Sequence, residues 1–225
     1  MCSSDLIVPI RLSEKEYVRA HDFRRYLHKN LEDFIIETPL EKPLDLLNKK
    51  FDASLIKDVQ ANWIPYDFKN QNIDDFLENL NIDKTVEISS IKGGYSNALK
   101  QLNKFIEVGY QDYAKYRSDP SKEASSQLSP YFHHGQISTH EVFEKISELE
   151  SWSPESINPK MVGRREGWWG SSENFESFMD ELITWRELGY HTCVRRANYN
   201  QYSSLPEWAI KTLHEHSSDE REYTY

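Results

Sequence analysis

The chain has 225 residues, enough for one large domain or two small ones with a buried core. Its formal net charge of −10 excludes a protein that is basic throughout, so any nucleic-acid surface has to be a local basic patch. Two cysteines exclude a disulfide framework, and no apolar run is long enough to span a bilayer. Six tryptophans and thirteen tyrosines with only eight glycines favour helical packing. We expect a mainly α, cytoplasmic protein that does not enter a membrane.

The N-terminal third of the sequence gives mixed signals. Residues 1–6 look unlike the rest of the chain, and they are read either as a leader that is not native or as a frayed terminus. The β-branched run 7–10 predicts one strand whose sheet partners are not in this chain. A helix is predicted over residues 13–36, opened by a capping box of Ser13 and Glu16.

Helical spacing continues along the rest of the chain. Shorter helices are predicted over 44–56 and 74–80, after proline breaks. The strongest apolar stripe covers 95–113, and Pro120 prevents the helix from continuing. A further helix is predicted to begin after Ser138, which forms a capping box with Glu141. A helix over 173–191 is predicted to be capped by Ser171 or Ser172, and a last helix covers 206–214.

A polar loop between two of these helices carries three serines, Ser125, Ser126 and Ser129. Hydroxyls and free backbone N–H groups ahead of a helix can bind a diphosphate. The alternative is an ordinary polar loop, because serine clusters are typical of loops. Arg117 could pair with a phosphate or with Asp119 on the surface.

The helix over 173–191 is apolar nearly all round, which predicts that it is buried. Glu181 and Arg186 would be costly there unless they are paired or face a cavity. Glu181 and Trp185 are four residues apart and therefore on one face, where they could bond to and stack on a planar ring. The alternative is a core aromatic beside a buried ion pair. The two histidine pairs, 133–134 and 214 with 216, lack matching ligand spacing, so no metal site is predicted.

The order and spacing of several motifs resemble the flavin-binding core of the DNA photolyase and cryptochrome family, in particular its class II branch. The motifs are Tyr-x-x-x-Arg-x-Asp-Pro at 113–120, Ser-x-Leu-Ser-Pro-Tyr at 126–131 with Gly-Gln-Ile-Ser at 135–138, Glu-Leu-Ile-x-Trp-Arg-Glu-Leu at 181–188, and Leu-Pro-Glu-Trp-Ala at 205–209. Each motif alone is weak, but the set in this order is specific.

The resemblance implies an FAD bent inside a helical domain, with Glu181 bonding to damaged pyrimidines and Trp185 beside them. It implies light-driven repair of cyclobutane pyrimidine dimers in UV-damaged DNA, a carbon–carbon lyase reaction, by a protein that we expect to be a monomer. A cryptochrome-like flavin photoreceptor and a flavin-free helical interaction module are the alternatives. The residues implied to hold FAD are Tyr113, Arg117, Ser125, Ser126, Leu128, Ser129 and Arg186.

The resemblance also implies a domain plan. Residues 1–12 would be the leader and last strand of an α/β antenna domain, 13–94 a helical linker region, and 95–225 the first part of the FAD-binding helical domain. The asparagine and aspartate that face the flavin ring in the family would lie beyond residue 225. We therefore expect a piece of a longer protein that by itself neither binds FAD tightly nor repairs DNA.

Overall fold

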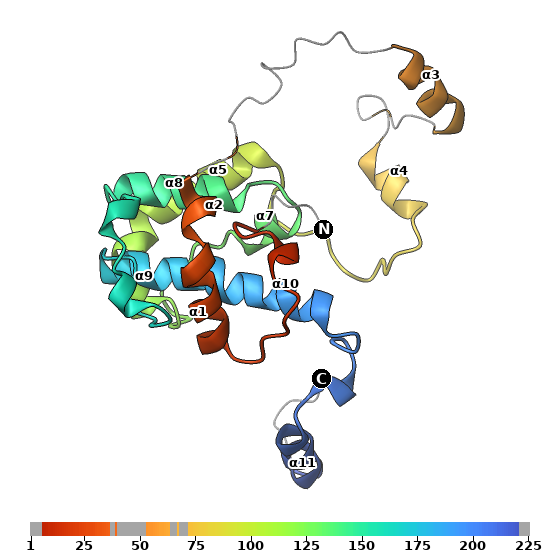
Figure 1. Ribbon diagram of the computed structural model, residues 1–225. Helices are drawn as coiled ribbons and strands as arrows, with labels where there is room; N and C mark the ends of the chain where they lie inside the picture. The colour runs from red at the N-terminus through yellow and green to blue at the C-terminus, as the bar shows by residue number, and fades with distance from the viewer. Residues whose placement is uncertain (1–5, 37–38, 40–52, 64–66, 68–71, 221–225) are drawn as a thin grey trace. The chain divides into compact units, whose positions relative to one another are not determined.

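The computed structural model describes residues 6–36, 39, 53–63, 67 and 72–220. These residues are mainly helical, and no β-strand occurs among them, which confirms the predicted mainly α class (Figure 1). The chain divides into two compact units, one of residues 1–38 with 93–225 and one of residues 39–92. In the described part, no helix is both long and apolar enough to cross a membrane.

Among its described residues, the unit of residues 39–92 contains two short helices. Helix α3 spans Ala53–Asn62, and helix α4 spans Ile73–Glu78. The side chain of Asn72 caps α4 by accepting a hydrogen bond from a backbone N–H two residues on. Most of the predicted 44–56 helix lies outside the described residues, and the predicted 74–80 helix is observed as α4.

The predicted strand at residues 7–10 is wrong. Residues 7–9 form no strand, and a short 3₁₀ helix, η2, comes next at Ile10–Leu12. The N–H groups of Ile7 and Val8 donate to Oε1 of Glu187, at 2.7 and 3.1 Å. A buried carboxyl therefore satisfies the donors that a neighbouring strand would otherwise take. Residues 1–5 of the predicted leader lie outside the described part.

The predicted 13–36 helix is observed as two helices, α1 at Ala20–Asn30 and α2 at Glu32–Ile36. The capping box does not form, because the carboxylate of Glu16 binds Arg196 at 2.5 Å instead of a helix terminus. Residues of α1 are buried against the helices of the 93–225 segment, so they belong to its core.

The predicted 95–113 helix is observed as a nearly continuous helical path with a π-helical part in its middle. At Gly109 the path runs close to a neighbouring loop, since a Cβ there would lie 3.0 Å from the carbonyl oxygen of Glu123. The path comprises α5 (Tyr95–Lys104), the π segment η4 (Phe105–Gly109), the 3₁₀ segment η5 (Tyr110–Asp112) and α6 (Tyr113–Tyr116).

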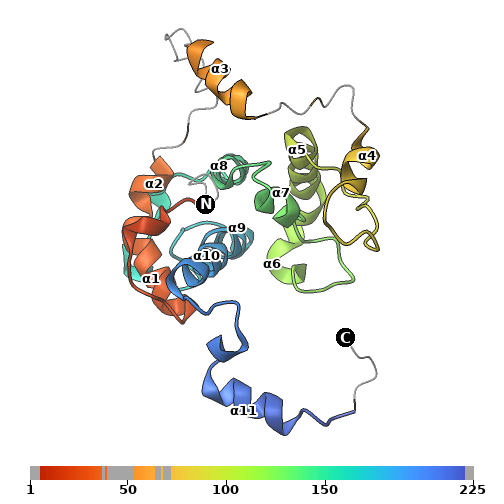
Figure 2. The same cartoon turned by 90° about the vertical axis from the view of Figure 1, so that its right-hand side faces the viewer.

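A long helical path near the C-terminus lies at the centre of its unit. It comprises α9 (Glu173–Met179), the π segment η8 (Asp180–Trp185) and α10 (Arg186–Arg195). Figure 2 shows it between α1 and α2 on one side and α6 and α7 on the other. Ser172 caps it by accepting from the N–H of Phe175 at 3.2 Å, as predicted. Its apolar side chains are buried on nearly every face, which confirms the predicted burial.

The remaining helices complete the described part. Helix α8 begins after Ser138, whose Oγ accepts from the N–H of Glu141 at 3.0 Å, so this predicted cap is confirmed. The predicted last helix is observed as α11. The bounds are α7 Ser129–His133, α8 Thr139–Leu149, η6 Pro154–Ser156, η7 Pro159–Met161, η9 Tyr202–Ser204 and α11 Glu207–Glu215.

Candidate functional site

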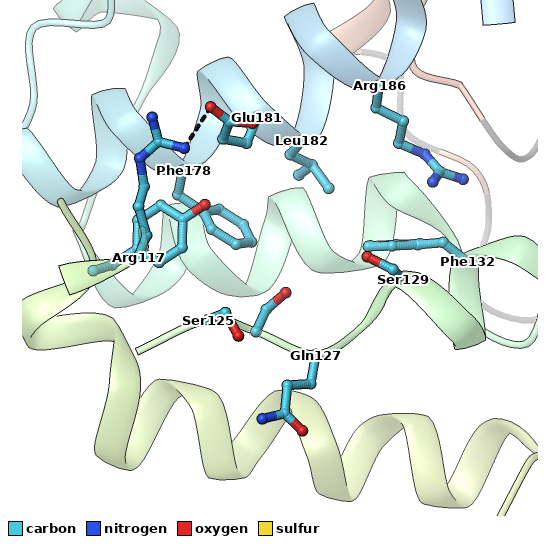
Figure 3. Close-up of a pocket in the computed structure, with 11 residues that line it drawn as sticks. Arg117, Ser125, Gln127, Ser129, Phe132, Phe178, Glu181, Leu182 and Arg186 are labelled. Atoms are coloured by element: carbon cyan, nitrogen blue, oxygen red, sulfur yellow. Dashed lines mark hydrogen bonds and ion pairs between the residues drawn. The ribbon is translucent and has the colours of Figure 1, made fainter. Parts of the chain in front are cut away.

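A cavity of about 370 Å³ lies between the serine loop, residues 125–129, and the central α9–η8–α10 path (Figure 3). Seven of the nine side chains singled out in the sequence line it, although they come from segments more than fifty residues apart. The lining residues are Tyr113, Arg117, Ser125, Ser126, Gln127, Ser129, Phe132, Phe178, Glu181, Leu182 and Arg186.

The serine loop places polar groups along one wall. Its backbone is tied to α5, because the side chain of Gln101 donates to the carbonyl of Ser126 at 3.0 Å. Gln127 has a positive φ of 53°, a left-handed conformation that non-glycine residues rarely adopt. The hydroxyls of Ser125 and Ser129 make no hydrogen bond to any other residue that the structure describes. They are therefore free to bond to a ligand.

An ion pair crosses the opposite side of the cavity. Nη1 of Arg117 lies 2.5 Å from Oε1 of Glu181, with 23% and 34% of the two side chains exposed (Figure 3). Asp119, the surface partner considered for Arg117, instead accepts from Ser121 at 2.7 Å. Burial, followed by the charge of Glu181, raises the pKa of the Tyr113 hydroxyl to about 12. That hydroxyl therefore remains protonated at neutral pH.

Arg186 places a second positive charge at the cavity. Its guanidinium lies 4.6 Å from the ring centre of Phe132 and 5.3 Å from that of Tyr190. Stacking on two rings fixes the guanidinium at a defined position. The cavity therefore combines two guanidinium groups and several hydroxyls, donors that suit a ligand with phosphate groups, with one acceptor, the carboxylate of Glu181.

Two predicted residues do not line this cavity. Leu128 is fully buried in the core, so its side chain packs where the serine loop is anchored. Trp185 is 49% exposed and lines a separate hollow of about 790 Å³, which shares Ser129 and Arg186 with the cavity. Glu181 and Trp185 therefore face different spaces.

Four lining residues were not singled out in the sequence. Phe178 lies three residues before Glu181, and Leu182 lies four residues before Arg186, so helical spacing from these two charged residues could have pointed to them. Gln127 lies inside the serine loop and Phe132 just after it, and no pattern in the sequence marks either of them.

Comparison with known proteins gives a consistent match along almost the whole chain. The chain is 29% identical over 223 residues, 99% of its length, to a deoxyribodipyrimidine photo-lyase of Methanothermobacter thermautotrophicus. It is 27% identical over 214 residues to the protein of that name from Potorous tridactylus. The chain is thus similar to proteins of the DNA photolyase and cryptochrome family. No family model matches the chain.

The match to this family covers only part of the photo-lyases. The chain spans 41% of the length of the Methanothermobacter protein and 34% of the Potorous one. A shorter match links it to the other branch of the family, since 51 residues are 49% identical to cryptochrome-2 of Arabidopsis thaliana. That second match covers 23% of the chain, whereas the photo-lyase matches cover nearly all of it.

Proposed function

We propose that the chain carries the FAD site of a class II-like deoxyribodipyrimidine photo-lyase, which repairs cyclobutane pyrimidine dimers in UV-damaged DNA by light-driven chemistry. One observation supports this proposal above the others. The hydroxyls of the serine loop and the Glu181–Arg186 stretch of the central helix line a single cavity. The matches to photo-lyases from an archaeon and a marsupial agree with this function.

The residues present fit the polar part of FAD. The cavity volume of about 370 Å³ falls within the range of small-molecule sites. Hydroxyls of Ser125, Ser126 and Ser129 would bond to the diphosphate, and Arg117 and Arg186 would offset its charge. Phe178 and Phe132 would provide apolar contact for ring atoms. Tyr113 completes the proposed set, and Leu128 would act by anchoring the loop.

FAD held there would supply light-driven electron donation to the pyrimidine dimer. The side chains of this chain would bind and orient. Glu181, held by Arg117, would accept a hydrogen bond from the flipped bases, and Trp185 would stack beside them at the neighbouring hollow. Flipping a damaged base pair costs less than flipping an intact one, because its stacking is already weakened.

The flavin part of the proposal is tested by titrating FAD into the chain and following flavin fluorescence. We expect weak but saturable binding, reduced at least tenfold by the double substitution Ser125→Phe and Ser129→Phe, which fills the cavity wall. The control is Ser121→Phe, since Ser121 is exposed and does not line the cavity. An affinity that the double substitution leaves unchanged would contradict the FAD site and favour a flavin-free helical module.

The short match to a plant cryptochrome, 49% identical over 51 residues, supports one second candidate, a flavin photoreceptor that does not repair DNA. Repair is tested by illuminating the protein with FAD and a UV-irradiated oligonucleotide and by measuring the loss of pyrimidine dimers. Light-dependent repair that Glu181→Gln reduces would support the photo-lyase. Because the chain spans only 41% of the length of the Methanothermobacter photo-lyase, FAD binding without repair would favour the photoreceptor only in a protein that spans the full photo-lyase length. We further propose that the protein acts as a monomer in the cytoplasm.

A further inference from the structure

A group of positive side chains lies around a second hollow of about 890 Å³, formed by α1, η7 and the loop after η7. The basic cluster is defined here as Arg25, Lys160, Arg164 and Arg165, and all four side chains are exposed. No residue of this hollow lines the candidate FAD cavity. The two spaces can therefore be tested independently.

The basic cluster has almost no counter-charge of its own. Glu166 is the one acidic residue among those that line the hollow. Within the part of the chain that the structure describes, none of the four basic side chains takes part in an ion pair or a hydrogen bond. Four positive charges are thus grouped without partners in a chain whose net charge is −10. Such a local positive potential attracts anions.

The loop after η7, which carries Arg164 and Arg165, is fixed on α1. The N–H of Gly163 donates to Nδ1 of His28 at 3.1 Å, and the carbonyl of Gly163 lies 3.2 Å from Nδ1 of His21. Burial lowers the pKa of His28 to about 3, so this ring stays neutral and can accept the bond. His28 also stacks on Trp168 with ring centres 3.9 Å apart. The loop is therefore fixed in the arrangement that brings its charges beside Arg25.

Gly163 permits this close approach. Its φ is +85°, and a Cβ at this position would lie 3.1 Å from Cβ of Arg25. Both the left-handed backbone and the narrow gap favour glycine here. The contact fixes the spacing between Arg25 on α1 and the arginines of the loop.

We propose that the basic cluster is a binding site for phosphate groups, separate from the FAD cavity. Three of its four cations are guanidinium groups, whose planar donors match phosphate oxygens in pairs. The volume of about 890 Å³ is large enough for a ligand of nucleotide size. The phosphates could belong to a free nucleotide or to a nucleic-acid backbone, and the same donors would bind either. This proposal does not depend on the photo-lyase function.

The test measures binding of ATP without added metal, and of a single-stranded DNA 12-mer, by calorimetry at low salt. The variant Arg164→Gln with Arg165→Gln removes two charges from the cluster. The matched control is Arg11→Gln with Lys100→Gln, which removes two exposed charges that line neither hollow. We expect the cluster variant to weaken binding at least tenfold and the control to weaken it less than twofold.

A third variant, Arg117→Gln with Arg186→Gln, separates the cluster from the FAD cavity. We expect this cavity variant to keep at least one saturable binding site for the probe, with the same affinity as the wild type has. The proposal is overturned if the cavity variant, and not the cluster variant, loses affinity for the probes. It is also overturned if the control variant loses as much affinity as the cluster variant, or if neither probe binds to the wild type. Tight binding of ATP identifies a free nucleotide as the ligand, whereas binding of the 12-mer alone identifies a nucleic-acid backbone.

Discussion

Arg24 and Asp180 form a two-pronged ion pair inside the core, with Nε to Oδ1 at 2.7 Å and Nη2 to Oδ2 at 2.9 Å. Only 9% and 5% of the two side chains are exposed. The pair joins α1 to the first residue of the π segment η8, one position before Glu181. It therefore helps to hold the segment that presents Glu181 to the cavity, and π segments are often found at functional sites.

We predict that Arg24→Met destabilises the fold by about 3–5 kcal/mol, because it leaves the carboxylate of Asp180 buried without a partner. The free energy of unfolding, measured by urea denaturation, checks this. Arg24→Met combined with Asp180→Leu should cost much less than the single change, since both charges are then gone. As a control, Arg19→Met breaks an exposed pair with Asp22 and should cost less than about 1 kcal/mol. Equal losses at positions 24 and 19 would contradict the argument.

The helices and the candidate site were predictable from the sequence to different degrees. The helices follow from apolar spacing and local caps, and Ser138 and Ser172 cap the helices where the sequence places them. These signals are local, because a cap acts within one turn. Residues on opposite walls of the cavity, such as Ser129 and Glu181, were brought together only by the family resemblance.

The errors in the prediction arise from long-range contacts. The run at 7–10 has the composition of a strand, but the carboxyl of Glu187, 179 residues or more away, takes its N–H groups. The Ser13–Glu16 signal fits a cap, but Arg196 binds Glu16 instead. Neither partner is marked in the sequence near the segment concerned. Local patterns cannot reveal such competition.

We predict that Glu187 makes stability depend on pH. Burial raises the pKa of its carboxyl from the ordinary 4.5 to about 8, although the N–H groups of Val8 and Ile7 act in the opposite direction. The folded state thus holds this proton to a higher pH than the unfolded state. The contribution of the neutral Glu187 carboxyl to the free energy of unfolding is therefore complete below about pH 4.5, and it is lost as the pH rises through about 8.

The comparison that checks this uses Glu187→Gln, which keeps an oxygen acceptor but cannot ionise. The free energy of unfolding of the wild type, relative to this variant, should fall steadily between pH 5 and pH 8. Glu14→Gln, at an exposed position, should leave the pH dependence of the wild type unchanged. A difference between wild type and Glu187→Gln that stays constant over this range would refute the buried neutral carboxyl.

Two glycines provide an opposed pair of predictions. Gly170 has φ +65°, and a Cβ there would lie 2.1 Å from the carbonyl oxygen of Ser156. Gly170→Ala should therefore lower stability by at least about 2 kcal/mol, because both the backbone and its neighbour have to move. Gly189 lies in α10, and a Cβ there would meet no atom within 4 Å apart from its chain neighbours and the backbone of its own helix. Gly189→Ala should therefore raise stability by about 0.5–1 kcal/mol. Thermal unfolding of both variants checks the signs, and the same sign for both would contradict this interpretation.

The left-handed backbone of Gln127 allows the strain of the serine loop to be measured. A non-glycine residue in the left-handed backbone region lowers the free energy of unfolding by about 1–2 kcal/mol. Glycine removes this strain, but the greater entropy of glycine in the unfolded chain cancels part of the gain. Gln127→Gly should therefore raise the free energy of unfolding by up to about 1 kcal/mol. Ser151→Gly, at the other such position among the described residues (φ 50°), should give a similar gain outside the cavity. The affinity for FAD distinguishes the two variants. Gln127→Gly loosens a loop that lines the cavity and should weaken FAD binding, whereas Ser151→Gly should not. Equal FAD affinity for both variants would show that the shape of this turn does not matter for the ligand.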